Sequence, residues 1–146
     1  MPEIDKFKGT ERIYMSKALL YTTNTTDQAT VATGTVLDAG RIVRRYGCNL
    51  GLSGGNITVM GEGYYNIDVM VNLEGGAAGT AVVTIYKNGV AIPGAVAQRT
   101  VAADTIYNLT IPATIREFCN CQDVITVEVS GVATTVNELT VRVTKE

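Results

Sequence analysis

The residues that could do chemistry in this chain are few, and the most suggestive are in the triplet Cys119-Asn120-Cys121. On a strand, residues i and i+2 share a face, so both thiols could point toward one metal ion. Zinc needs four ligands, however, and the chain holds no histidine and one further cysteine, Cys48. An odd cysteine count without export signals favours free thiols. We expect buried, inert thiols; the alternatives are a metal or disulfide shared between subunits, and plain exposure.

Catalytic chemistry finds little support elsewhere in the sequence. Without histidine there is no Ser-His or Cys-His nucleophile pair, and no glycine-rich phosphate motif leads into a helix. Asp68 and Glu128 fall on strand faces that point away from the expected core, where they would be solvated or lie in an interface. We therefore predict a protein that is not an enzyme and that uses no cofactor and no metal.

The charge balance, 12 basic against 14 acidic residues, does not favour nucleic acid as a partner. One basic cluster contains Arg41, Arg44 and Arg45. It suits an exposed strand edge, where charge discourages aggregation; the alternative is contact with an anionic partner or with an acidic residue of another subunit. No apolar run approaches the ~18 residues that span a bilayer. With no signal peptide at residues 1–17, we expect synthesis in the cytoplasm and no membrane contact.

The elements that must position these residues are strands. Threonine, valine and isoleucine, which suit the pleated surface of a sheet, make up about a third of the chain. The clearest strand is 64–73, where alternate residues are apolar and would face the core. Those inward residues are Tyr65, Ile67, Val69, Val71 and Leu73. Asn88-Gly89, between two apolar runs, predicts a two-residue hairpin turn.

Further strands are expected at short intervals, for a total of about 8–10 antiparallel strands. Their expected ranges are 30–37, 42–52, 57–60, 81–87, 96–103, 107–111, 124–130 and 139–144. Pro93-Gly94 predicts an additional turn. This spacing indicates an all-β sandwich or jelly roll.

Residues 1–26 differ in composition from the rest. Seven of the 26 charged residues lie in the first 17 positions, and apolar residues are sparse. We predict an N-terminal arm over 1–26 and one jelly-roll domain over 27–146. The arm is either a frayed terminus or a segment that orders against a partner. In the second case its docking anchors would be Ile4, Phe7, Ile13 and Tyr14.

Several outward positions are large and apolar for a face expected to meet solvent. Tyr64, Met70 and Val124 form an apolar stripe, which is typical of an interaction surface. Burial of that face in an oligomer would explain it. Tyr64, Tyr86 and Tyr107 suit packing at such an interface, and stacking on a glycan is their alternative role.

Short motifs support a family resemblance. Gly63-Tyr64-Tyr65-Asn66-Ile67 resembles the Gly-x-Tyr-x-(Phe/Ile) signature of the C1q/TNF-like jelly roll, and residues 86–89 look like the hairpin that follows it. Residues 108–111 and 122–127 are similar to its later pair of strands. The nearest look-alikes are bacterial and phage members, such as the C-terminal domain of collagen-like spore-surface glycoproteins and domains of phage virion proteins. The resemblance implies a compact homotrimer with a binding or structural role.

These observations together predict a non-enzymatic bacteriophage virion protein. It would be a trimeric capsid decoration, cement or head-fibre protein that docks on the capsid or another virion protein through its arm, with Tyr64, Met70, Tyr86 and Val124 at the trimer interface. A host-surface glycan is an additional expected partner. The alternative function is a trimeric glycan- or receptor-binding surface module with ligand contacts in loop 75–79 and at Pro93-Gly94.

Overall fold

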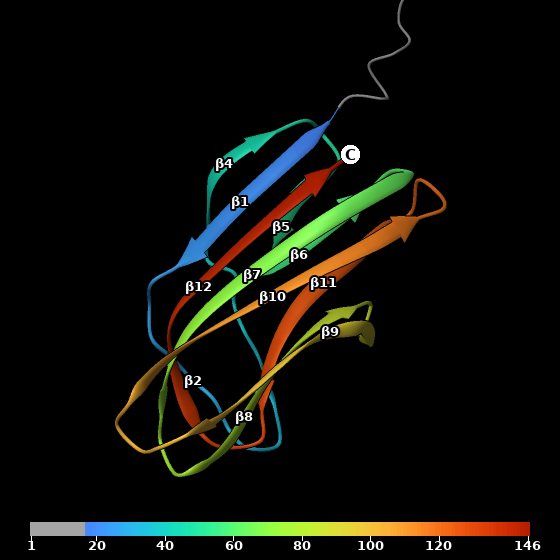
Figure 1. Cartoon of the computed structure of the whole chain (residues 1–146). Coiled ribbons are helices and arrows are strands. Elements are labelled where there is room, and N and C mark those ends of the chain that lie inside the picture. The colour runs from blue at the N-terminus through green and yellow to red at the C-terminus, as the bar shows by residue number, and fades with distance from the viewer. Residues whose placement is uncertain (1–16) are drawn as a thin grey trace, which may run out of the picture.

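The computed structural model describes residues 17–146, which form two facing β-sheets (Figure 1). The expected all-β sandwich is confirmed, with twelve strands in the described part where about 8–10 were expected. The strands are β1 (Ala18–Asn24), β2 (Gln28–Ala29), β3 (Thr35–Val36), β4 (Arg41–Tyr46), β5 (Leu50–Ser53), β6 (Asn56–Met60), β7 (Gly63–Gly75), β8 (Gly79–Lys87), β9 (Val90–Val101), β10 (Ile106–Glu117), β11 (Gln122–Ser130) and β12 (Thr134–Lys145).

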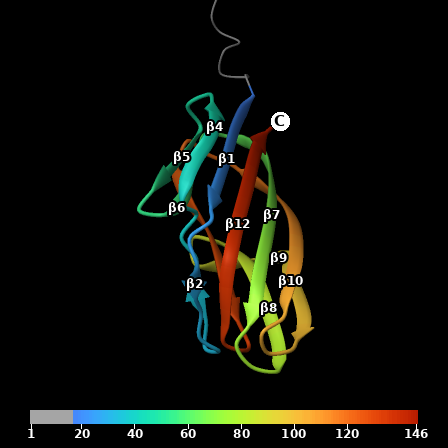
Figure 2. The same ribbon diagram turned by 90° about the vertical axis from the view of Figure 1, so that its left-hand side faces the viewer.

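The two sheets have similar sizes and antiparallel strand pairing. The first sheet has the order β10-β7-β12-β1-β4, with β2 paired to β12. The second has the order β5-β6-β11-β8-β9, with β3 paired to β11. Figure 2 shows β4, β1, β12 and β7 of the first sheet side by side. None of the described residues belongs to a helix long and apolar enough to cross a membrane.

Strand β7 lies inside the first sheet, next to the edge strand β10. It pairs with β10 on one side and with β12 on the other. Its five inward side chains are all fully or almost fully buried: Tyr65, Ile67, Val69, Val71 and Leu73. They pack against buried residues of the second sheet, including Val83, Ile85 and Val127. Because side chains alternate along a strand, the even-numbered residues of β7 must lie on the outer face of the sandwich.

The predicted Asn-Gly hairpin is confirmed. Lys87 of β8 pairs with Val90 of β9, so Asn88 and Gly89 are the two turn residues. Both have positive φ, 52° and 81°, as a two-residue turn between twisted strands requires. The turn fixes Asn88 beside the start of β11, which matters for the polar cluster described below.

The expected arm boundary at residue 26 is wrong. Ala18–Asn24 forms β1, which lies between β12 and β4 in the first sheet. Its inward residues Ala18, Leu20 and Thr22 are buried. The linker was expected because charged residues precede this stretch and threonines occur within it. The alternating side chains of Ala18, Leu20 and Thr22 are nevertheless sufficient to fill the core at this position.

The rest of the predicted arm, residues 1–16, lies outside the described residues. This includes the four expected docking anchors, Ile4, Phe7, Ile13 and Tyr14, which therefore remain predictions.

Two local expectations also fail. Residues 30–37 do not form one strand, because β2 and β3 are two-residue pieces separated by a turn that ends at Gly34, whose φ is +123°. Pro93-Gly94 does not separate two strands but lies inside β9. Gly94 has a φ of +80°, and the β8–β9 register shifts here, so the pair is part of a β-bulge.

Candidate functional site

An open groove of about 640 Å³ runs across the outer face of the first sheet. The pairing of the strands assembles it: Met70 lies opposite Thr110 of β10 and Thr140 of β12. Tyr21 of β1 lies opposite Arg142 and Arg44 on its two sides. The lining is mainly apolar and comprises Leu19, Tyr21, Arg44, Asp68, Val69, Met70, Thr110, Ile111, Pro112, Thr140 and Arg142.

Polar side chains border this groove along the sheet. Arg142 forms an ion pair with Asp68, its cross-strand neighbour, at 2.9 Å. Farther along β7 in one direction, Asn108 donates to Asn72 at 2.8 Å. In the other direction Thr114 donates to Asn66, also at 2.8 Å. The face therefore has an apolar centre between hydrogen-bonded polar rows, the distribution found in protein interfaces with a polar rim.

The residues expected at the trimer interface do not form one stripe. Tyr64 and Met70 lie on the outer face of β7 in the first sheet, whereas Tyr86 and Val124 lie on the outer face of β8 and β11 in the second. The expectation of a single apolar stripe that includes Val124 is therefore wrong, because alternation within each strand does not reveal which sheet the strand joins. Their roles as trimer contacts stay predictions.

Tyr86 has a local partner on the second sheet. Its hydroxyl donates to Glu128 at 2.9 Å. That hydrogen bond, with burial and the charge of Glu128 adding to it, raises the pKa of Tyr86. Glu128 thus acts as an acceptor on the outer face.

The structure places Arg41, Arg44 and Arg45 on β4, an exposed edge strand of the first sheet. This is the position that their charge suggested. Arg44 also lines the groove, so one of the three cations borders its apolar lining from the edge strand. Contact with an anionic partner remains a prediction for all three.

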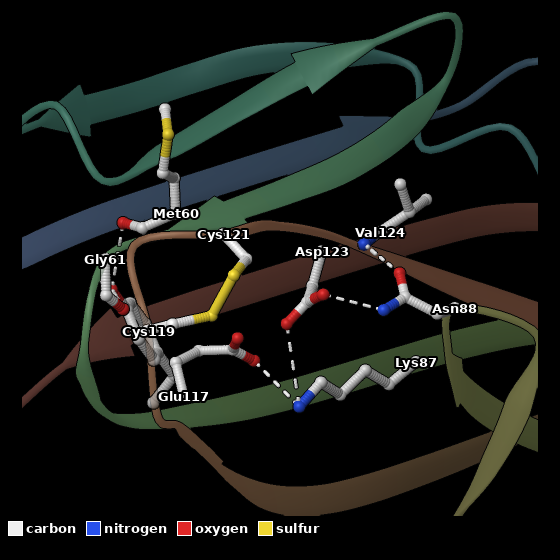
Figure 3. Close-up of polar contacts among 10 residues, drawn as sticks. Met60, Gly61, Lys87, Asn88, Glu117, Cys119, Cys121, Asp123 and Val124 are labelled. Atoms are coloured by element: carbon white, nitrogen blue, oxygen red, sulfur yellow. Dashed lines mark hydrogen bonds and ion pairs between the residues drawn. A yellow bond between two sulfur atoms is a disulfide. The ribbon is translucent and has the colours of Figure 1, made fainter.

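A second, polar site lies at the end of the sandwich where β10 ends and β11 begins (Figure 3). The Glu117 carboxylate is almost fully buried and lies 3.0 Å from the Lys87 ammonium. Lys87 also lies 3.6 Å from Asp123. Asn88 donates to Asp123 at 2.6 Å and accepts from the backbone N–H of Val124 at 2.8 Å. The hairpin turn therefore ties β8 to β11 at the same point where the charges meet.

The environment shifts the pKa values of this cluster in opposite directions. Burial raises the pKa of Glu117, and a hydrogen bond with Asp123 adds to this effect. The same hydrogen bond lowers the pKa of Asp123. Burial alone would lower the pKa of Lys87, but its hydrogen bond to Glu117 and the two carboxylate charges outweigh that, so the pKa is raised. The lysine therefore stays charged between two inequivalent carboxyl groups.

Tyr65 joins this end of the sandwich to the core. Its ring is fully buried. Its hydroxyl lies within hydrogen-bonding distance of two backbone carbonyl oxygens, that of Gly61 at 2.9 Å and that of Met60 at 3.2 Å. Burial, followed by the charge of Glu117, raises the pKa of Tyr65. A buried tyrosine hydroxyl usually finds such a partner, and here it holds the turn between β6 and β7 in place.

The expectation of buried free thiols is wrong. Cys119 and Cys121 form a disulfide in the loop between β10 and β11, and all three cysteines, with Cys48, are exposed. The β10–β11 loop follows the polar cluster and projects from the end of the sandwich, so Cys119 and Cys121 have no apolar layer to enter; Cys48 lies in the loop between β4 and β5. Within residues 17–146, no group of three histidine, cysteine or acidic side chains could hold a metal ion.

An aromatic patch lies next to the disulfide loop. The Arg116 guanidinium lies 5.0 Å from the centre of the Tyr64 ring and 4.8 Å from that of Phe118. Arg116 also donates to the Tyr64 hydroxyl at 3.2 Å. Phe118 is 75% exposed, the highest fraction among the large apolar side chains of the described residues. Phe118 is therefore largely accessible to a ligand, although Arg116 lies over its ring.

Neither the protein-family models nor the curated proteins compared with the chain match it. Solved structures do. Murine APRIL at pH 5.0 is similar with a TM-score of 0.71 and 16% identity over 90% of this chain and 100% of that one. The globular domain of zebrafish complement 1qA is similar with a TM-score of 0.63 and 8% identity, over 86% of this chain and 94% of that one. The vertex protein P5 of PRD1 is similar with a TM-score of 0.61 and 13% identity, over 88% of this chain and 72% of that one.

These likenesses confirm the expected fold, a C1q/TNF-like jelly-roll sandwich. Their low identities make them evidence for the fold alone.

Three features of these sites were not anticipated from the sequence. Leu19 and Tyr21 of the groove lay in the predicted arm, although the alternation around them was a usable signal. Phe118 had no distinctive context. The pairing of Lys87 with Glu117 joins strands of different sheets, which no local pattern encodes.

The raised pKa of Glu117 has a consequence for stability. A carboxyl whose pKa is higher in the folded than in the unfolded chain contributes stability below its unfolded value, and loses that contribution as the pH rises through its folded value. Glu117→Gln removes this loss. We expect the free energy of unfolding of the variant, minus that of the native chain, to increase as the pH rises from about 4.

Urea denaturation at a series of pH values measures this difference. Glu62→Gln is the matched control, because it removes an exposed carboxylate outside the cluster. A Glu117→Gln difference that stays constant or decreases with pH would contradict the assignment.

Proposed function

We propose that this chain is a non-enzymatic structural protein of a bacteriophage particle, a trimeric capsid decoration, cement or head-fibre protein. The observation that carries self-association is the apolar groove on the outer face of the first sheet. The virion assignment is supported by the similarity in fold to the PRD1 vertex protein P5, a phage virion protein. The C1q/TNF-like resemblance implies the trimer.

The distribution of apolar surface favours a closed ring over a two-fold dimer. Besides the groove, the chain exposes Val90, Val96 and Ile106 along the edge formed by β9 and β10, at 70%, 44% and 65%. A face that binds a different surface of the next copy makes a heterologous contact, and such contacts close into rings when the rotation permits. In this arrangement the β9–β10 edge of one copy fills the groove of its neighbour.

In this proposal the arm that precedes β1, residues 1–16, docks on the particle. Ile4, Phe7, Ile13 and Tyr14 supply its apolar anchors. Ala18 pairs with Lys145, so the arm joins the sandwich at the end where β12 finishes (Figure 1). The opposite end of each sandwich is then directed away from the docking surface.

Met70→Lys tests the groove as the contact between copies. An unpaired charge in a desolvated interface costs several kcal/mol, so we expect the dissociation constant of the trimer to rise at least about a hundredfold. Light scattering should then give a trimer of the 15.5 kDa chain for the native protein and a monomer for the variant at micromolar concentration.

The matched control is Thr126→Lys, the same charge on the outer face of the second sheet. Because the proposed contact uses the groove of the first sheet and not Tyr86 or Val124 of the second, this variant should leave the trimer intact. If Thr126→Lys is monomeric and Met70→Lys is trimeric, the contact between copies lies on the second sheet and the proposed groove contact is wrong.

Removal of residues 1–16 tests the docking role. All strands of the described residues 17–146 remain, so we expect the truncated protein to stay trimeric. Added to particles stripped of the full-length protein, it should fail to bind, and co-sedimentation measures this. Binding at the full-length level would contradict docking through the arm, whereas loss of the trimer would make the arm the oligomerisation device.

The second candidate function is a trimeric glycan- or receptor-binding module. The patch of Tyr64, Arg116 and Phe118 favours it, because an exposed aromatic ring backed by a cation can stack on a sugar. If it is correct, a glycan array should show binding that Phe118→Ala reduces at least about tenfold, with Val90→Ala as an exposed apolar control. An array without hits would remove this candidate.

A further inference from the structure

All three cysteines lie in loops at one end of the sandwich, on the two sides of the turn between β6 and β7. On one side, Asn49, next to Cys48, donates to the Met60 carbonyl at 2.8 Å. On the other, Asn120, between the bonded cysteines, accepts from the backbone N–H of Glu62 at 3.3 Å. Gly61 and its neighbours thus stand between the free thiol and the disulfide; the side of the turn with the disulfide is visible in Figure 3.

The disulfide is poorly suited to act as a structural clamp. It encloses one residue, Asn120, and a disulfide that closes so short a loop restricts the unfolded chain little, because this stabilisation grows with the length of the closed loop. Both of its cysteines are exposed. Exposed disulfides are the ones most open to attack by thiolates. The same end of the chain therefore carries an accessible disulfide and an accessible thiol, Cys48.

Within one chain the turn between β6 and β7 separates these groups. Cys48 lies just before β5 and Cys121 just before β11, and β6 lies between these two strands, so the spacing is roughly 10 Å at about 4.8 Å per strand. A new disulfide needs its Cα atoms within about 7 Å of each other.

Between copies, the proposed ring determines which loops meet. In the ring proposed above, the β9–β10 edge of one copy packs into a groove that extends to β4 of the next through Arg44. The loop after β10 then comes to the loop after β4 of its neighbour. A ring axis along the strands keeps both loops at the same end.

We propose that the Cys119–Cys121 disulfide is the acceptor in a thiol–disulfide exchange with Cys48 of a neighbouring copy, which links the copies covalently. This inference rests on the proposed self-association. The Cys48 thiolate attacks one sulfur of the disulfide and a bond forms between those two sulfur atoms. The bond between Cys119 and Cys121 breaks, and its electron pair leaves on the other sulfur, which takes up a proton. No oxidant is consumed.

The test uses the full-length chain, purified without reductant and incubated anaerobically with a chelator to prevent air oxidation. After alkylation of free thiols, a non-reducing denaturing gel should show species of two and three times 15.5 kDa that disappear with dithiothreitol. Trypsin cuts after Arg45, Lys87, Arg116 and Arg142, so mass spectrometry should find residues 46–87 joined to residues 117–142.

Two variants separate exchange from simple oxidation. Cys48→Ser lacks the attacking thiol and should give no linked species. Cys121→Ser keeps Cys48 and Cys119 as thiols but has no disulfide to open, so without an oxidant it should also remain unlinked. Linked species in anaerobic Cys121→Ser would overturn the exchange reaction.

Light scattering on the same samples separates this inference from the proposed function. A native trimer whose chains all run as monomers on the non-reducing gel, or whose Cys48 peptide is linked only within a monomer, overturns the exchange and leaves the trimer standing. A native monomer without linked species overturns both.

Discussion

Backbone pairing along both sides of β7 is the constraint on which the structure depends. Twelve residue pairs join it to β10 and eleven join it to β12. A slip of one residue on either side would turn its buried side chains toward water, so the hydrophobic effect specifies the register. Once the register is set, Asp68 must face Arg142 and Met70 must lie between two threonines. The groove, its ion pair and the anchoring of the β6–β7 turn by Tyr65 are consequences of this one alignment.

The sequence was informative where a single local rule decides the conformation. Alternation identified β7, and the positive φ values that Asn88 and Gly89 tolerate identified the hairpin. The sequence was misleading where a segment was interpreted from its composition and not from its alternation. The segment 18–24 was assigned to an arm because it follows charged residues and contains threonines, yet Thr22 is fully buried in the first sheet. A β-branched hydroxyl side chain can occupy an inward position, so polarity alone does not exclude a core strand.

The candidate sites were harder to predict because long-range pairing creates them. Tyr21 and Arg142 are neighbours only because β1 and β12 pair, and the position of β1 within the sheet is not a local property. The same holds for Lys87, Glu117 and Asp123, which come from three strands. Phe118 and the bonded cysteines are exposed because the β10–β11 loop projects from the end of the sandwich. Sequence patterns gave the residue types of these sites, and the sheet order gave their neighbours.

The position of β1 has a mechanical consequence. It is hydrogen-bonded on one side to β12 and on the other to β4, and all three strands are antiparallel neighbours. Tension applied through the chain that precedes Ala18 would pull along the strand axis, so the hydrogen bonds on both flanks would bear the load together in shear instead of opening one after another. A module anchored in this way resists detachment by force better than one whose anchor begins at a strand that can be peeled from an edge.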